Sequence, residues 1–413
     1  SGALRALTDA GRRCVGVGPG EPADWSNHPG VFASHYDSGR ITRHLDRVRE
    51  WGVLAARSIA GYADLEARSG IAFHRPVGVV LAVPADEVAA ITAVAEELAV
   101  DLSTYAPDAA SDFDSRLSFP SGSTLLAEPG PAGHIDPRRM LRANLAVATA
   151  GGATVVREAA TSLEPGSSGW TVTTATGVVV TADRVVVATG AHSDELRGLA
   201  DCPAFDVRGE TIVMATLGPD EQARLAGMPS ILAELDDPTY DDLYVVPPTD
   251  YPDGSVRLKL GATRRDMFHV HDGAARREWM SGDRHRDELD ALRDLLTTLV
   301  PGLAAESWET KPCLITQTAS GLPVVDHLAP GLVLAAGGNG YAAKSANAIG
   351  ALAAQLVVDG AWTDPDLDHR RLRPRAAFAD RRVLRTPPDR VEDGAPAVRF
   401  RRAGAPSSVA SAR

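Results

Sequence analysis

The strongest constraint on the fold is an apolar strand that leads through a glycine turn into a helix near the end of the chain. Residues 332–336 (LVLAA) are a short apolar run, residues 337–340 (GGNG) form a glycine turn, and residues 342–358 suit a helix. A second strand, 184–188, ends in the same way at Thr189 and Gly190. Such units build α/β sheets, in which ligands lie at the carboxyl ends of the strands.

A β-rich segment separates these two units along the chain. Residues 208–217, 243–246 and 255–262 alternate in polarity or are β-branched, which predicts an antiparallel sheet. We also expect a helix that Asp136 caps, with Pro137 in its first turn. The remaining expected helices cover residues 1–10, 41–67, 87–98 and 275–299. The pattern predicts one α/β layer that an antiparallel sheet interrupts.

Length and charge limit the classes of function. A chain of 413 residues is too long for one simple core and suggests two closely packed domains. Its net charge of −12 argues against nucleic acid as a partner. No apolar run of about 18 residues is present, so we expect no membrane span. Three widely spaced cysteines make neither a disulfide framework nor a zinc pattern, which favours a cytoplasmic protein.

Lysine is rare in this chain. Lys259, Lys311 and Lys344 are three residues among 42 Lys and Arg. Arginine serves as the surface cation almost everywhere, whereas lysine is a compact charge whose pKa the surroundings can tune. The three positions that carry lysine are therefore candidates for residues of a functional site.

Four segments give these residues a family context: residues 34–43 (SHYDSGRITR), 258–261 (LKLG), 313–318 (CLITQT) and the 337–344 turn. In order and spacing they resemble the monomeric sarcosine oxidase family, FAD-dependent amine oxidoreductases of the D-amino-acid-oxidase-like superfamily with N-methyltryptophan and pipecolate oxidases among them. The resemblance implies an α/β fold in which a Rossmann-like, glutathione-reductase-type FAD domain is interleaved with an antiparallel-sheet substrate domain.

The same resemblance implies a division of the chain. The FAD domain would comprise residues 1–75, 131–205 and 311–362, and the substrate domain residues 76–130 and 206–310. Residues 363–413 would form a basic tail, partly disordered.

The implied activity is oxidation of a secondary amine or imino acid that bears a carboxylate, with O2 as acceptor and H2O2 as product. Lys344 and Arg43 match the cations that hold the substrate carboxylate, and Lys259 matches the lysine beside which oxygen is reduced. Arg40 matches an arginine near the flavin ring, and Tyr244 a tyrosine that lines the pocket.

The resemblance also implies how FAD is held. Cys313 matches the cysteine that forms a thioether to the flavin ring, and the 34–43 segment contacts the flavin. The implied cofactor-binding residues are Cys313, Ser34, His35, Arg40, Thr189, Gly190, Gly337, Gly338, Gly340 and Lys344.

The sequence departs from the family pattern at several points. The strand and Gly-x-Gly-x-x-Gly turn that should receive the FAD pyrophosphate are absent from it. Gly18 occupies the place of the expected ribose-binding acid, with Glu21 as the nearest substitute. Tyr341, Ala342 and Ala343 replace His, Gly and Phe beside Lys344, so sarcosine itself is not a secure substrate prediction.

Two other functions stay open on the sequence. A flavin dehydrogenase would pass electrons to another acceptor, and a degenerate relative would act as a binding or scaffold protein. His269 and His271 could ligate a metal, but no third ligand is evident, so we predict no metal site. We expect a small-molecule substrate, O2 as co-substrate, and a monomer or dimer.

Overall fold

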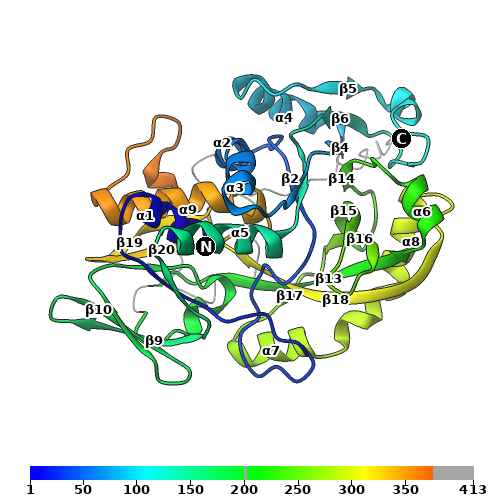
Figure 1. Ribbon diagram of the computed structural model, residues 1–413. Coiled ribbons are helices and arrows are strands. Elements are labelled where there is room, and N and C mark those ends of the chain that lie inside the picture. The colour runs from blue at the N-terminus through cyan, green and yellow to red at the C-terminus, as the bar shows by residue number, and fades with distance from the viewer. Residues whose placement is uncertain (200–201, 375–413) are drawn as a thin grey trace, which may run out of the picture.

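A computed structural model of the chain describes residues 1–199 and 202–374. The expected basic tail from residue 375 onward lies outside the described residues. The described part is a mixed α/β structure with two main layers (Figure 1). No helix in this part is long and apolar enough to cross a membrane.

A nine-stranded sheet, here called the roof sheet, fills one side of the molecule (Figure 1). Its order is β17-β13-β16-β15-β14-β4-β6-β5, and β18 pairs with β13. β13, β16, β15 and β14 are antiparallel neighbours, which confirms the predicted antiparallel sheet. Its strands are β4 (Val79–Val83), β5 (Ser103–Tyr105), β6 (Thr124–Glu128), β13 (Asp206–Leu217), β14 (Ser230–Glu234), β15 (Tyr240–Asp250), β16 (Val256–Arg264), β17 (Phe268–His269) and β18 (Ala305–Gln317).

The second layer contains the strand–turn–helix units. β20 (Leu332–Ala336) pairs in parallel with β12 (Val185–Val187) and leads into α9 (Ala342–Asp359), as predicted. β19 (Val324–Ala329) pairs antiparallel to β20. β1 (Val15–Val17) pairs in parallel with β8 (Thr154–Val156) as a separate two-stranded sheet. In the described chain no strand joins these two sheets.

Helices cover this layer (Figure 1). α1 (Gly2–Asp9) packs so closely on α9 that a Cβ at Gly350 would lie 2.5 Å from the backbone nitrogen of Ala3. Glycine at this position therefore lets the two helices approach. α5 (Pro137–Ala150) begins as predicted, because the Asp136 side chain accepts a hydrogen bond from the Arg139 backbone amide.

The remaining elements connect the layers or extend them. They are β2 (Arg40–Thr42), β3 (His74–Arg75), β7 (Gly133–Ile135), β9 (Ala160–Gly166), β10 (Gly169–Thr174), β11 (Val179–Ala182), α2 (Arg49–Ala60), α3 (Tyr62–Ser69), α4 (Ala85–Glu97), α6 (Pro219–Arg224), α7 (Gly273–Ser281), α8 (Leu289–Leu299), and four 3₁₀ turns at Pro107–Asp112, Gly190–Glu195, Arg284–Glu288 and His369–Leu372.

Two predicted helices are wrong in extent. The helix expected over residues 41–67 begins only at Arg49 and breaks at Gly61, because β2 and an inward-turned segment occupy residues 40–48. The Glu128 carboxylate holds that segment by accepting hydrogen bonds from the backbone amides of His44 and Leu45, which no periodicity in the segment reveals. The helix expected over residues 275–299 is interrupted at Gly282, whose backbone is extended.

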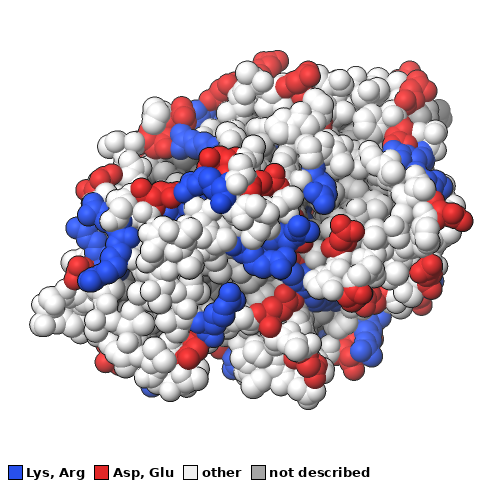
Figure 2. Space-filling model, viewed as in Figure 1, with Lys and Arg blue, Asp and Glu red and all other residues white. Residues whose placement is uncertain are grey.

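The two expected domains remain a proposal. Roof-sheet strands come from residues 79–128 and 206–317, and β18 runs across the expected boundary at residue 310. The two layers have largely separate apolar cores, one around Val213, Leu260 and Leu296, the other around Trp51, Val333 and Leu352. Charged side chains of both signs are mixed over the face seen in Figure 2.

Candidate active site

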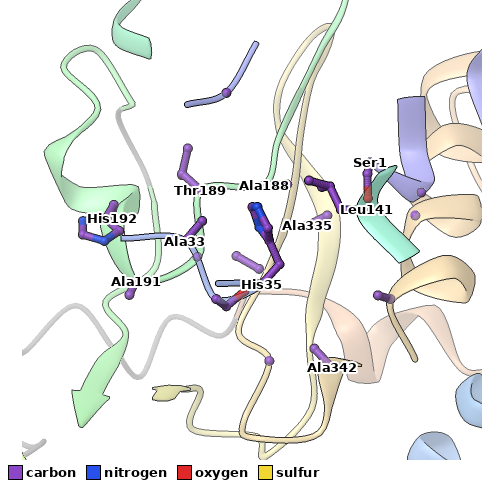
Figure 3. A pocket seen from close by; sticks show the side chains of 18 of the residues that line it. Ser1, Ala33, His35, Leu141, Ala188, Thr189, Ala191, His192, Ala335 and Ala342 are labelled. Atoms are coloured by element: carbon purple, nitrogen blue, oxygen red, sulfur yellow. The ribbon is translucent and has the colours of Figure 1, made fainter. Parts of the chain in front are cut away.

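A cavity of about 2890 Å³ lies between the α/β layer and the roof sheet. All ten residues expected to bind FAD line it, although they come from segments spread over more than 300 positions of the chain. Figure 3 shows part of this cavity, with Ser1 and Leu141 on one side, Thr189 and His192 on the other, and His35 between them. Among the expected catalytic residues Arg40, Arg43, Tyr244 and Lys344 also line it.

Lys259 is buried and does not line the cavity. Its ammonium Nζ donates to Asp37 Oδ2 at 2.7 Å and to the Gly39 carbonyl, and lies 5.5 Å from the ring centre of Tyr244. Burial lowers the pKa of Lys259 to about 8, and the charge of Asp37 opposes that shift. Any effect of the Lys259 ammonium on the cavity can therefore only be electrostatic, across the part of the wall that Asp37 and Tyr244 form.

Asp37 is the centre of this group. Its carboxylate accepts hydrogen bonds from Lys259, Arg40, the Tyr251 hydroxyl (3.0 Å) and the Ser38 amide (2.8 Å). Burial alone would raise the pKa of Asp37, but Lys259 and Arg40 hold it well below its usual range. The two cations and one carboxylate leave a net charge of +1 beside the cavity.

A second group of the same composition surrounds Asp46. Asp46 Oδ2 accepts hydrogen bonds from Lys344 Nζ at 2.7 Å and Arg43 Nη1 at 3.0 Å. All three side chains are buried, and burial lowers the pKa of Lys344 to about 8. Here too the net charge is +1, which matches a single substrate carboxylate.

Tyr341 closes the wall beside the second group. Its ring centre lies 5.8 Å from both the Arg43 guanidinium and the Lys344 ammonium, and its ring packs near Trp51. The family's histidine is replaced here by an aromatic face that adds favourable cation–π contacts. Tyr244 lines the cavity from the roof sheet, where a Cβ at Gly261 would meet its ring at 2.5 Å. Glycine at position 261 therefore lets Tyr244 lie against the roof sheet.

Cys313 lies on β18 as a free thiol facing the cavity. Arg40 Nη2 is 3.9 Å from its sulfur, and burial raises the pKa of the Cys313 thiol. Lys311 lies two residues earlier on the same face, with its ammonium 3.6 Å from the ring centre of Trp25 and donating to the Tyr36 carbonyl at 3.1 Å. The loop that carries Trp25 and Tyr36 thus borders the thiol.

Several observations test whether the cavity fits FAD. Gly190, Gly337 and Gly340 line it with φ values of +55°, +79° and +81°, so three backbone turns approach the space without side chains. The first turn of α1 also faces it. Glu21, the substitute for the ribose-binding acid, lines the cavity and forms an ion pair with Arg138 at 2.6 Å. The residues present therefore fit a long dinucleotide.

Sequence reasoning missed Asp37 and Asp46. Each aspartate stands three residues from an arginine that the sequence predicts to be a site residue: Asp37 precedes Arg40, and Asp46 follows Arg43. This three-residue spacing could have indicated an ion pair between each aspartate and its arginine. The lysine partners lie more than 200 residues away, so only the fold brings them to the aspartates.

The histidine pair carries no metal site in the described part of the chain. His269 Nδ1 lies 2.6 Å from Asp206 and the ring stacks on His271. No group of three or more potential ligands is placed to hold a metal among residues 1–199 and 202–374.

Comparison with known proteins agrees with this geometry. Residues 2–356 match the family model described as FAD-dependent oxidoreductase. No curated protein sequence matches the chain significantly. Among solved structures, NikD, an amino acid oxidase of nikkomycin biosynthesis, superposes with a TM-score of 0.70 at 21% identity over 90% of this chain and 94% of that one.

Two further structures share the fold. Iminodiacetate oxidase from Chelativorans sp. BNC1 has a TM-score of 0.67 at 20% identity, over 90% of this chain and 95% of its own. L-proline dehydrogenase from P. horikoshii has a TM-score of 0.68 at 15% identity, over 90% of this chain and 93% of its own.

Proposed function

The chain belongs to the family of FAD-dependent oxidoreductases, and on this premise we propose that it oxidises a secondary amine or imino acid that bears a carboxylate. The observation that carries the proposal is the Arg43–Asp46–Lys344 group, which has a net charge of +1 and whose two cations line the cavity. A single carboxylate is the ligand that this charge and these donors suit.

Each side chain then has a defined task. Arg43 and Lys344 hold the substrate carboxylate and fix the carbon next to the nitrogen, which lowers the entropic part of the barrier. Their charge also lowers the pKa of the bound amine and favours the neutral form, which has a lone pair to donate. Tyr341 and Tyr244, which also line the cavity, exclude water from it. A bound FAD would supply the acceptor for the hydride as the amine becomes an imine, and the two electrons with which O2 and two protons would form H2O2.

The oxygen half of the reaction would rely on the Asp37 group. A protonated Lys259 and Arg40 together provide a fixed positive charge that stabilises negative charge developing on oxygen. We also propose that Cys313 forms the covalent link to the flavin. Support comes from its place in the cavity wall, with a guanidinium 3.9 Å from its sulfur.

A dehydrogenase is the second candidate, and the enclosure of Lys259 favours it. Because the ammonium does not line the cavity, oxygen would not touch it directly. Comparing flavin reoxidation by O2 with reoxidation by a quinone separates the two functions. In an oxidase the reduced flavin reacts with O2 fast enough to support turnover, whereas a dehydrogenase turns over only when the quinone is present.

Purified protein tests the proposal directly. We expect a yellow protein whose colour stays with the polypeptide after acid precipitation, and which forms H2O2 with N-methyl or cyclic amino acids. Cys313→Ala should release the flavin on precipitation, and Lys259→Met should slow reoxidation far more than reduction. A protein that holds no flavin would refute the proposal, and unchanged reoxidation in Lys259→Met would refute the oxygen site.

A further inference from the structure

A row of polar side chains crosses the roof sheet on the face that looks into the cavity. Glu210 on β13 is the register partner of Cys313 on β18, and Asp242 on β15 is the partner of Thr263 on β16. The Thr263 hydroxyl donates to Glu210 Oε1 at 3.4 Å and links the two halves of the row. All four residues line the cavity. The carboxyl groups of Glu210 and Asp242 therefore flank Thr263 on the same surface as Cys313.

Among the described residues, neither of these two carboxyl groups has a cation in direct contact with it, although the charges of Arg208 and Arg47 act on Glu210 and Asp242 from farther away. No ion pair in the described part of the chain includes either of them, although the acidic residues beside them are compensated. Asp241 pairs with Arg265 at 2.7 Å, and Glu234 pairs with Arg47. The arginine closest along β13, Arg208, is engaged by Asp206 at 2.7 Å.

Their environment disfavours charge. Burial raises the pKa of Glu210 to about 8, with the charge of Asp242 as the second cause and Glu288 as a smaller one. Burial also raises the pKa of Asp242 to about 6. A cation placed between them would lower both pKa values, because it compensates the buried negative charges.

The spacing suits one cationic group. The strands of Glu210 and Asp242 are separated by the strand of Thr263, hence by two spacings of about 4.8 Å each. An ammonium or guanidinium placed in the cavity over Thr263 could donate hydrogen bonds to both carboxyl groups. The cations Arg43 and Lys344 line the same cavity, so a ligand with a carboxylate at one end and a basic group at the other meets opposite charges at both.

We propose that Glu210 and Asp242 bind a positively charged group of the substrate, so that the substrate is a basic amino or imino acid with a second nitrogen beyond the one that is oxidised. The inference rests on the proposed function and defines its substrate class. Glu210 and Asp242 determine specificity and take no part in the transfer of electrons.

The test compares matched substrates and isosteric variants. N-methyl-lysine and N-methyl-norleucine have side chains of similar length and differ in the terminal ammonium. We expect kcat/KM to favour N-methyl-lysine by about 10- to 100-fold, the range for a hydrogen bond to a charged group. Glu210→Gln and Asp242→Asn should remove most of that preference by raising KM for the basic substrate, with kcat and the neutral substrate little affected.

Controls separate specificity from folding and from the function itself. Glu309→Gln changes an exposed acid of β18 outside the cavity and should leave the preference intact. Equal kcat/KM for both substrates, or a preference that survives in both isosteric variants, would overturn the inference while the oxidase proposal stands. If flavin is bound but neither compound is oxidised, the oxidase proposal fails. The inference is then tested by a binding titration, in which each compound is added to the protein and the change in flavin absorption is followed. Tighter binding of the basic compound would support the inference, and equal binding would overturn it.

Discussion

Replacing Asp37 by Asn removes the carboxylate that Lys259 and Arg40 share, with almost no change in shape. Asp37 is only 3% exposed, and its oxygens accept hydrogen bonds from both cations, from Tyr251 and from the Ser38 amide. In the variant the buried Lys259 and the partly exposed Arg40 lie close together without this counter-ion. Arginine cannot lose its proton in a protein, so the proton should leave Lys259.

The size of the effect follows from the pKa of Lys259. In the native protein it is about 8, so roughly nine tenths of the lysine is protonated at pH 7. An opposite charge at this distance shifts a pKa by about 1–3 units, so the loss of the Asp37 charge should lower the pKa of Lys259 to roughly 6. About one tenth of the lysine would then be protonated at pH 7. If the reaction of the reduced flavin with oxygen requires protonated Lys259, the rate of reoxidation at pH 7 should fall about tenfold.

Stopped-flow mixing of the reduced protein with oxygenated buffer measures this step. Because the protonated form is active, the rate should fall as pH rises through the pKa, near pH 8 in the native protein and near pH 6 in Asp37→Asn. The matched control is Asp46→Asn, which alters the carboxylate-binding group and should slow flavin reduction instead. A loss that is equal at every pH in Asp37→Asn would show damage to the fold and refute the electrostatic argument.

Three further outcomes are expected. Lys344→Met should raise the substrate KM by about 10- to 100-fold in steady-state kinetics, because one charge-assisted hydrogen bond to the carboxylate is lost; an unchanged KM would remove this lysine from the binding site. Gly261→Ala should lower the free energy of unfolding by about 1–3 kcal/mol in a denaturant titration, since its Cβ would overlap the Tyr244 ring, and an unshifted midpoint would contradict that packing. As pH rises through about 8, Glu210 ionises and Lys344, which binds the carboxylate of every substrate, loses its proton. The ratio of KM for a basic substrate to KM for its neutral analogue should therefore fall through this pH range, and a ratio that rises would contradict the role of Glu210.

Much of the α/β framework was predictable because local chemistry specifies it. The apolar run 332–336, the glycine turn and the helix after it are contiguous, so their order alone fixes a strand–turn–helix unit. The Asp136 cap with Pro137 is equally local. Prediction failed where a distant residue controls the backbone, as at residues 40–48, where Glu128 holds the chain out of the helix that its apolar spacing suggests.

The sequence by itself determined which cations are unusual, because three lysines stand out in a chain that otherwise uses arginine, and it placed Cys313 in a motif with them. Only the tertiary structure decided how these charges are balanced. Lys259 meets Asp37 and Lys344 meets Asp46 across 222 and 298 positions of the chain. Likewise, the strand register alone brings Glu210, Thr263 and Asp242 into one row. Burial makes each charge depend on its partner, and those partners are set by packing between distant segments, which no local pattern encodes.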